Sequence, residues 1–297
     1  MSEPFRLLCV HPHPDDESIA CGGVLARASD EGAHTAVVTC TGGEAGENLA
    51  GIDLGDEDLA THRRRELADA LRVLGVDDHV WLGYRDSGMA GTEENAHPEA
   101  FAGADVDEAA RRLAAVIRRL RPHVVVSDDA DGTYGHPDHV QAHHVTVRAV
   151  AIAATDEDLD GSAPWRVAKR YAHTIAQERI LRGHAAMVEA GLPSPFGEQA
   201  EVTVEELPFG TPESRLTTIV DVRPQLERKR AALRAHRSQI GEDSFFLNTP
   251  AELAESFFGR EDFVLQEGEA AADPRTGLEA DLFAGLTRPD AVGRPIW

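Results

Sequence analysis

A short apolar run, Leu7-Leu8-Cys9-Val10, leads directly into the polar stretch His11-Pro12-His13-Pro14-Asp15-Asp16-Glu17, and a helical pattern begins at Ser18. An apolar run of this length is typical of a buried strand. The two prolines disfavour helix and lack amide hydrogens, so the turn after the strand is stiff and extended. In open α/β sheets, ligands bind at the carboxyl ends of the strands. The stretch therefore predicts a strand, a turn that carries chemistry, and a helix.

The side chains of this turn suit a metal ion. His13 and Asp16 stand three residues apart, so both can point at one ion, while Asp15 between them aims elsewhere. One carboxylate is then free to act as a base beside the metal. Asp15 also has a simpler interpretation as the N-cap of the following helix, a role open equally to Asp16 or Ser18.

A second cluster of the same kind lies further along the chain. The stretch Gly132-Thr133-Tyr134-Gly135-His136-Pro137-Asp138-His139 follows the apolar run Val124-Val125-Val126 and precedes another helical pattern. Adding His139 to His13 and Asp16 gives a site of two histidines and one carboxylate with open coordination positions. Such a set suits a catalytic Zn²⁺, or Fe²⁺ instead, better than a closed structural site.

Strand-like and helix-like segments alternate from Phe5 to about Ala153. Short apolar strands that alternate with helices are typical of a parallel sheet covered on both faces. The sequence has no GxGxxG and no GxxxxGK motif, so nothing favours a dinucleotide or a P-loop site. The predicted fold class is α/β: a Rossmann-like, mostly parallel sheet covered by helices, with a smaller C-terminal α+β extension. The expected strands are 7–10, 35–40, 80–82 and 124–127, and the expected helices are 18–30, 59–74 and 106–120.

We divide the chain into a Rossmann-like metal-binding catalytic region, 1–153, and a C-terminal region, 154–297, that completes the fold and the substrate pocket. Two long acidic, glycine-rich loops in the first region are expected to form walls of that pocket, because long loops in a compact domain are usually functional. These loops are 41–58 and 83–105. In the second region we expect strands at 169–174 and 216–222 and helices at 176–190 and 224–239, and we assign no structure to 191–213 or to the acidic tail from 267.

The composition argues against several classes of partner. The formal net charge of the 297 residues is −23, which disfavours nucleic acid and anionic membranes, since both bind clustered positive charge. No apolar run reaches membrane-spanning length and no signal-peptide pattern is present, so we expect a cytoplasmic protein. The three cysteines, Cys9, Cys21 and Cys40, fit no disulfide framework and no CxxC metal spacing, and we expect buried thiols. The oligomeric state stays open, and a homo-oligomer is compatible with the sequence.

The two clusters together resemble the N-acetylglucosaminyl-phosphatidylinositol de-N-acetylase superfamily, whose members are metal-dependent sugar deacetylases. Within it the chain looks most like the actinobacterial mycothiol enzymes, the deacetylase and the S-conjugate amidase. The segments that carry this closer likeness are Thr39-Cys40-Thr41-Gly42-Gly43-Glu44-Ala45-Gly46-Glu47, Asp86-Ser87-Gly88-Met89-Ala90-Gly91-Thr92 and Arg121-Pro122-His123-Val124-Val125-Val126. Weaker likeness continues from Lys169 to Gln239.

The resemblance implies roles for individual side chains. Asp15 matches the general base, and His136 matches a histidine that stabilises the oxyanion or protonates the leaving amine. Asp138 is expected to orient the His136 imidazole, and Tyr134 to donate its hydroxyl to the oxyanion. Three further residues match positions that line the sugar pocket: Arg63, Asp86 and Met89.

The function implied is that of a zinc-dependent amide hydrolase that removes the N-acetyl group from a glucosamine-containing small molecule. The favoured substrate is N-acetylglucosaminyl-inositol, in mycothiol biosynthesis. One alternative is a mycothiol S-conjugate amidase or a relative used in detoxification or natural-product assembly. A second alternative, from another class, is a non-catalytic sugar-binding protein.

Overall fold

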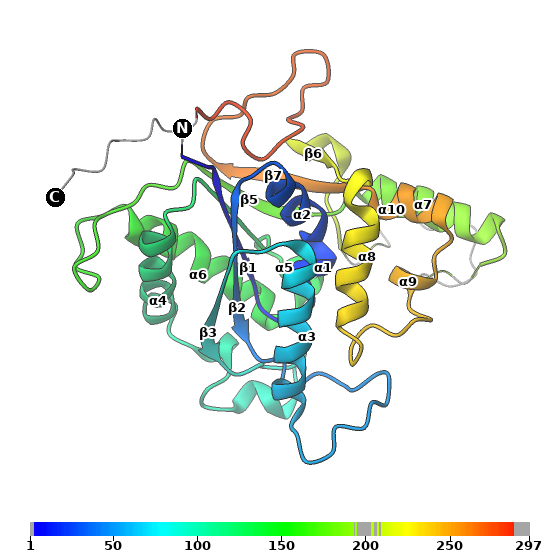
Figure 1. The fold of residues 1–297 in the computed structure, drawn as a ribbon, viewed down its shortest axis with the longest axis horizontal. Coiled ribbons are helices and arrows are strands. Elements are labelled where there is room, and N and C mark those ends of the chain that lie inside the picture. The colour runs from blue at the N-terminus through cyan, green and yellow to red at the C-terminus, as the bar shows by residue number, and fades with distance from the viewer. Residues whose placement is uncertain (1–2, 193, 195–202, 205–206, 208, 288–297) are drawn as a thin grey trace.

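The computed structural model describes residues 3–192, 194, 203–204, 207 and 209–287 (Figure 1). Its strands are β1 (Arg6–His11), β2 (His34–Thr41), β3 (Asp78–Tyr84), β4 (Val124–Ser127), β5 (Lys169–Thr174), β6 (Thr218–Asp221) and β7 (Arg260–Glu267). Its α-helices are α1 (Asp16–Ala20), α2 (Gly22–Asp30), α3 (Leu59–Leu74), α4 (Val106–Leu120), α5 (Gly132–Gly135), α6 (Pro137–Ala153), α7 (Gln177–Glu189), α8 (Leu226–Ala235), α9 (Phe245–Asn248) and α10 (Ala251–Phe258). Four short 3₁₀ turns are η1 (Glu93–Ala96), η2 (Phe101–Gly103), η4 (Glu213–Arg215) and η5 (Arg223–Gln225).

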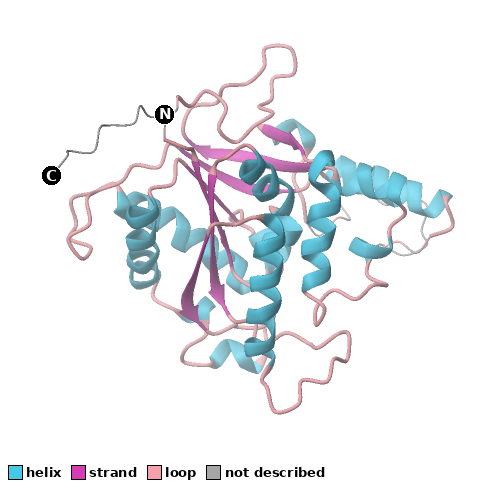
Figure 2. Ribbon diagram, viewed as in Figure 1, coloured by secondary structure: helices cyan, strands magenta, loops and turns pink. Residues whose placement is uncertain are grey.

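One seven-stranded sheet runs through the described part of the molecule in the order β3-β2-β1-β4-β5-β7-β6 (Figure 2). The first five strands in this order are parallel, and β7 and β6 are antiparallel to their neighbours. The prediction of a mostly parallel α/β sheet is therefore confirmed. Strand β7 was not predicted, because its sequence, REDFVLQE, begins with the acidic residues Glu261 and Asp262, which the structure buries in ion pairs with Lys229 and Arg179.

Helices cover both faces of the sheet, as the alternating side chains of β1 require. Leu8 and Val10 pack with the residues of α4 and α6 on one face. Leu7 and Cys9 face the opposite side and pack with α2, α3 and α8. The central strands β1 and β4 are thus buried on both faces, which explains why their sequences are short apolar runs.

The order of the strands places a ligand crevice between β1 and β4. The chain leaves β1 for β2 on one side, and it later returns to pair β4 on the other side of β1. Such a reversal of strand order opens a crevice at the carboxyl ends of the two strands. Both polar clusters found in the sequence follow these two strands, so the fold brings them to one crevice.

Two predicted helices differ from the structure. Residues 18–30 were expected to form one helix, but the chain forms α1 and α2 with a break at Cys21, whose φ is −128° and ψ is 6°. The helix expected at 224–239 begins after the 3₁₀ turn η5 and ends at Ala235. Helices 59–74 and 106–120 match the prediction, and Gly75 ends the first of them in a left-handed conformation with a φ of 76°.

A carboxylate from the C-terminal region caps the helix that follows the first catalytic turn. Glu261 on β7 accepts hydrogen bonds from the amides of Gly23, at 2.7 Å, and Val24, at 2.8 Å. The same carboxylate pairs with Lys229 of α8 at 2.6 Å, and both side chains are buried. Because free amides at a helix N-terminus need acceptors, this contact supplies α2 with a cap that its own sequence lacks.

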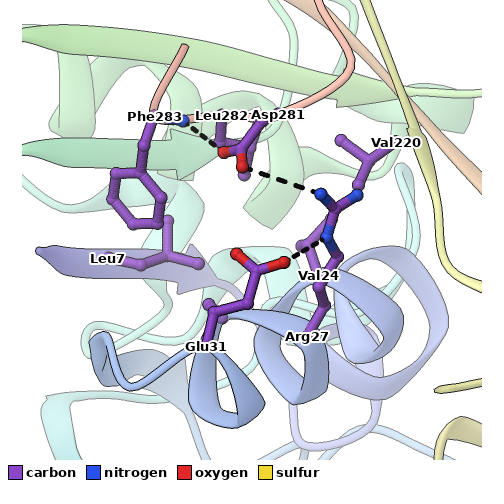
Figure 3. Close-up of a pocket in the computed structure, with 9 residues that line it drawn as sticks. Leu7, Val24, Arg27, Glu31, Val220, Asp281, Leu282 and Phe283 are labelled. Atoms are coloured by element: carbon purple, nitrogen blue, oxygen red, sulfur yellow. Dashed lines mark hydrogen bonds and ion pairs between the residues drawn. The ribbon is translucent and has the colours of Figure 1, made fainter.

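The segment after β7 also docks on the sheet. Phe283 stacks on Phe5 with ring centroids 4.8 Å apart, and Asp281 lies 3.7 Å from Arg27 of α2 (Figure 3). The strands of 154–297 share one sheet with those of 1–153, and the division of the chain into these two regions stays a prediction. Among the described helices, none has the length and apolarity needed to cross a membrane.

Candidate active site

Three predicted metal ligands meet in the crevice between β1 and β4. His13 and Asp16 come from the turn after β1, and His139 lies in the first turn of α6. The Asp16 Oδ2 atom is 3.3 Å from His13 Nδ1 and 3.5 Å from His139 Nε2. Burial opposes ionisation of Asp16, but the two histidines outweigh it and lower the pKa of its carboxyl. A buried, ionised carboxylate therefore stands between two imidazole nitrogens.

Two further carboxylates orient these imidazoles. The Oδ2 atom of Asp138 lies 3.2 Å from His13 Nε2, and Oδ1 of Asp128 lies 2.6 Å from His139 Nδ1. Each carboxylate accepts the ring N–H on the far side of its histidine, so the other nitrogen, which faces Asp16, is the one that would bind a metal ion. Burial lowers the pKa of both imidazoles, but the surrounding carboxylates outweigh it and raise the pKa of His13 and of His139. Sequence reasoning missed Asp128, although a carboxylate directly after the buried strand β4 was a usable signal.

The donor atoms fit a metal ion. His139 Nε2 is buried and has no hydrogen-bond partner in the described part of the chain. A buried polar atom without a partner is costly, and an ion is one of the few explanations for it. Two oriented imidazoles and one carboxylate are the donor set of open catalytic sites for Zn²⁺ or for non-haem Fe²⁺.

Asp15 occupies a strained position beside these ligands. Its φ of 124° is rare for a residue with a side chain and costs of the order of 1–3 kcal/mol. Its side chain turns to Arg63 of α3, whose Nη2 lies 3.1 Å from Asp15 Oδ2. Burial raises the pKa of Asp15 to about 6 although Arg63 opposes the shift. A carboxylate with a raised pKa beside a metal is suited to accept a proton.

The Arg63 guanidinium forms hydrogen bonds within the protein in this structure. Its guanidinium also donates to the backbone oxygens of Pro14, at 2.6 Å, and Gly43, at 2.9 Å, and the side chain is buried. The contacts hold the first turn from beneath. Its predicted contact with a sugar stays a prediction.

A buried network behind the turn fixes the backbone of Asp15. The Asp15 amide donates to Glu17 Oε2 at 3.0 Å, and Glu17 Oε1 lies 2.8 Å from Nε2 of His236 and 2.5 Å from the Ser18 hydroxyl. Glu17 and His236 are fully buried. His236 directly follows the last residue of α8, so the shorter helix than predicted still brings its imidazole to this network.

His136 is the N-cap of α6. Its Nδ1 atom accepts the Asp138 amide at 3.1 Å, so the neutral ring carries its proton on Nε2. Burial and the neighbouring His13 lower the pKa of His136 to about 4. The ring packs edge-on against His13 with centroids 4.7 Å apart. A neutral imidazole held in this way is a hydrogen-bond donor beside the ligands.

One predicted contact is wrong. The Asp138 carboxylate was expected to orient His136, but it bonds to His13 and to Ser87, whose amide and hydroxyl donate to it at 2.9 and 2.5 Å. The physical reason lies at the start of α6. His136 is the N-cap and its ring accepts the backbone amide of Asp138, so the Asp138 side chain is left to point towards Ser87, which follows β3. Asp138 instead accepts a hydrogen bond from His13, one of the predicted metal ligands.

The remaining predicted site residues differ in how deeply their side chains are buried. Asp86 is buried, accepts the amides of Ala45 and Gly88, and lies 3.4 Å from His13 Nε2. Tyr134 and Met89 are about half exposed, at 47% and 49%. Tyr134 packs against His139 with ring centroids 5.1 Å apart and borders a pocket of about 290 Å³. The crevice thus has a buried polar floor and an exposed rim.

Comparisons with known proteins agree with this geometry. Residues 8–150 match the family model described as PIG-L, GlcNAc-PI de-N-acetylase. The chain is 45% identical to the 1D-myo-inositol 2-acetamido-2-deoxy-alpha-D-glucopyranoside deacetylase 1 of Catenulispora acidiphila, with 98% of this chain and 92% of the relative covered. It is also 45% identical to the deacetylase of that name from Thermobifida fusca, with 94% of this chain and 99% of the relative covered.

The fold has solved counterparts. The N,N'-diacetylchitobiose deacetylase from Pyrococcus horikoshii, solved with its inhibitor, superimposes with a TM-score of 0.59. It shares 23% sequence identity, and the match covers 89% of this chain and 84% of that protein. At this identity the likeness supports the fold alone.

Proposed function

Because the chain belongs to the GlcNAc-PI de-N-acetylase family, we propose that it hydrolyses the N-acetyl group of 1D-myo-inositol 2-acetamido-2-deoxy-α-D-glucopyranoside. The products are acetate and the free amino sugar. Relatives that match nearly the full length of the chain carry this activity in their names. The reaction places the enzyme in mycothiol biosynthesis, as the sequence resemblance implied.

One observation carries the proposal. His13 Nδ1 and His139 Nε2 converge on Asp16, and a second carboxylate, Asp15, stands directly beside them with a raised pKa. A sugar-binding protein would need neither the convergent donors nor a strained acid next to them. The arrangement favours hydrolysis over binding alone.

We propose that His13, Asp16 and His139 hold a divalent metal, Zn²⁺ first and Fe²⁺ as the other choice. A metal in such a site supplies Lewis acidity and lowers the pKa of a water molecule towards about 7. Asp15 takes the proton of the attacking water, because its carboxylate is free of the ligand set. The same proton later passes from Asp15 to the departing amine, so that one side chain serves as base and then as acid.

His136 stabilises the negative charge that develops on the amide oxygen. Its Nε2–H faces outward because Nδ1 is occupied by the Asp138 amide. Between the two roles left open for this residue, the N-cap geometry supports the oxyanion donor. Tyr134 at the rim is a second donor candidate, since burial raises the pKa of its hydroxyl and keeps it protonated.

Three further residues belong to the proposed sugar pocket. Asp86 and Met89 stand at the floor and the rim of the same crevice, and we keep them with Arg63 as sugar-pocket residues. We also propose the cytoplasm as the compartment, because all three cysteines are free and buried.

The test is acetate release from the proposed substrate by the metal-loaded protein and by the same protein after chelation. We expect turnover by the loaded protein and its loss after chelation, with recovery on adding Zn²⁺ or Fe²⁺. A mycothiol S-conjugate is assayed in parallel. Faster cleavage of the conjugate would move the assignment to the amidase, and metal-loaded protein inactive on every amino-sugar amide would support the binding-protein alternative.

A further inference from the structure

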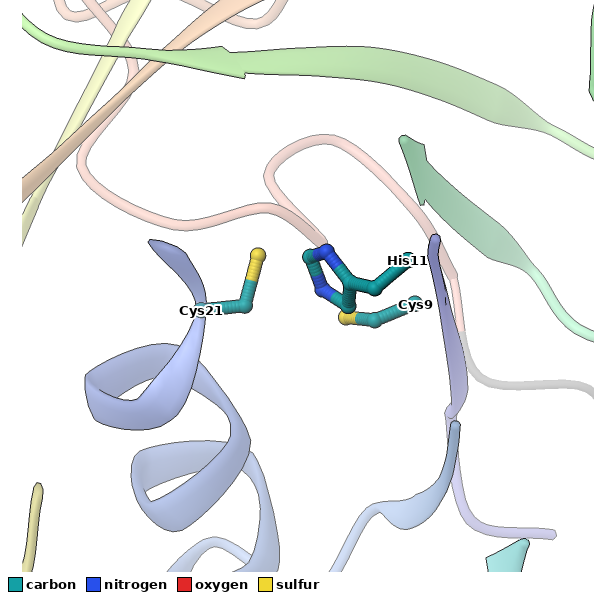
Figure 4. A group of neighbouring side chains, drawn as sticks. All are labelled: Cys9, His11 and Cys21. Carbon is teal, nitrogen blue, oxygen red and sulfur yellow. The ribbon is translucent and has the colours of Figure 1, made fainter. Parts of the chain in front are cut away.

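A second group of metal-binding side chains lies beneath the catalytic turn, on the opposite side of β1 from α4 and α6. Cys9 and His11 are two residues apart on the strand, so their side chains emerge on the same face. Cys21 stands at the break between α1 and α2 and points back at them (Figure 4). One ligand atom from each residue lies within 4.8 Å of those from the other two, and all three residues have zero exposure.

The imidazole of His11 faces the Cys21 thiol, a weak hydrogen-bonding group, in this interior. Neither Nδ1 nor Nε2 of His11 has a hydrogen-bond partner in the part of the chain that the structure describes. A neutral imidazole must carry one N–H, and a buried N–H without an acceptor costs about 1–3 kcal/mol. Native proteins rarely keep such a group unless a water or an ion satisfies it.

We propose that Cys9, His11 and Cys21 form a second, structural metal site that binds Zn²⁺. Two thiolates and one imidazole are soft and borderline donors, and this mixture is typical of zinc in closed structural sites. The catalytic set of His13, Asp16 and His139 contains no sulfur, so the two sites differ in donor chemistry.

A neighbouring histidine supplies a candidate for the fourth position that tetrahedral zinc requires. His173 on β5 lies with its ring centroid 5.5 Å from that of His11, and its Nε2 lies 3.2 Å from Asp128 Oδ1. His11, His173 and Asp128 also form a group of ligand atoms within 4.8 Å of one another. The second site therefore borders the carboxylate that orients His139.

Binding is coupled to loss of the two thiol protons. Burial raises the pKa of Cys21 well above its usual range, so the metal-free thiol stays protonated. Zinc replaces these protons, which leave to solvent as the ligands become thiolates. Because the site is fully buried, it fills while the chain folds, and it tethers the α1–α2 break to β1.

The third cysteine provides a matched control. Cys40 is also buried and free, but it lies on β2 and packs on the other face of the sheet, with the α4 and α6 residues. It has no place in the group formed by Cys9, His11 and Cys21. A Cys40→Ser variant removes one buried sulfur without touching the proposed site.

The experiment uses the full chain expressed with cobalt in place of zinc and purified under reducing conditions. Thiolate ligands give Co²⁺ an intense near-ultraviolet charge-transfer absorption that nitrogen and oxygen ligands do not give. We expect this absorption in the wild type and in Cys40→Ser, and its loss in Cys9→Ser and in Cys21→Ser. In zinc-grown protein we expect one more equivalent of zinc in the wild type than in either of the latter variants.

The wild type alone can overturn the proposal, so it stays testable even where a variant does not fold. Absence of the thiolate absorption from cobalt-grown wild type would refute it, as would a Cys9–Cys21 disulfide found by mass measurement of the purified protein. Absorption that persists in both Cys9→Ser and Cys21→Ser would assign the sulfur ligand elsewhere. Each of these results is independent of deacetylase activity.

Discussion

The turn after β1 and the turn after β4 carry similar residues but are held in different ways. In the first, Asp15 is kept in place by Arg63 from α3 and by a network that reaches His236 at the end of α8. In the second, His136 and His139 are fixed by their own helix and by Asp128, all within a short span of sequence. The proposed base, Asp15, is positioned by distant parts of the chain, whereas the proposed metal ligand of the second turn, His139, is positioned locally.

Because the two turns are held differently, mutations should be able to change the catalytic rate and the metal affinity separately. Damage to the distant supports of the first turn should alter catalysis while leaving metal affinity intact. Damage to the local supports of the second turn should weaken the metal first.

The largest effect is expected for Asp15→Asn. The amide cannot accept the proton of the attacking water, so we expect kcat to fall by about 10²–10⁴-fold. Metal content should stay at the wild-type level, because Asp15 is not in the ligand set. Acetate release and metal analysis on the same sample measure both quantities. The matched variant Asp16→Asn should lose the metal, and an Asp15→Asn protein with wild-type turnover would remove Asp15 from the mechanism.

Asp128→Asn probes the local support of the second turn. The amide no longer offers His139 Nδ1 a charged acceptor, and loss of such a carboxylate lowers metal affinity by about 10–100-fold. Competition with a chromogenic chelator gives the dissociation constant. The neighbouring Asp129→Asn is the control, since Asp129 bonds only loop amides in this region. Equal metal affinity in Asp128→Asn and wild type would contradict the proposal that Asp128 supports His139.

Arg63→Lys probes the distant support of the first turn. Lysine keeps the charge but cannot span the Asp15 carboxylate and two backbone oxygens at once, so we expect kcat to fall about tenfold with unchanged metal affinity. Steady-state kinetics measure both parameters. If Arg63 instead binds the sugar, the substitution would raise KM and leave kcat unchanged. Arg64→Lys on the same helix, where the guanidinium stacks 4.7 Å from the Trp81 ring, is the matched control.

The smallest effect is expected for Tyr134→Phe at the exposed rim. Loss of one neutral hydrogen bond to the oxyanion is worth about 0.5–1.5 kcal/mol, or roughly a 2- to 10-fold drop in kcat. Chelator competition should give the wild-type metal affinity. A drop as large as that of Asp15→Asn would instead give Tyr134 a central place in proton transfer.

The sequence predicted the central sheet and the meeting of the two clusters because these depend on local patterns. Apolar runs give β1 and β4, and the order of a parallel sheet brings their carboxyl ends together. His13, Asp16 and His139 could be named for that reason. The break at Cys21 escaped prediction because no proline marks it, although Gly22 and Gly23 follow it directly.

The supports of the site were harder to predict because they are long-range. Nothing in the sequence near Asp15 indicates that Glu17 pairs with His236, more than two hundred positions away. Asp138 was assigned to the wrong histidine, since side-chain direction at a helix start depends on the cap geometry. Strand β7 escaped because its buried acids are compensated by residues from other elements, which no local pattern reveals.

The cap that Glu261 places on α2 has a consequence for biosynthesis. The ribosome delivers His13, Asp16 and α2 early, but the carboxylate that accepts the Gly23 amide is synthesised 238 residues after that amide. Until Glu261 is synthesised, the amides at the start of α2 lack this acceptor, and Lys229 lacks the carboxylate with which it pairs in the folded protein. The nascent chain can collapse around β1, β2 and β4 early, yet the start of α2 acquires its cap only once β7 has been synthesised.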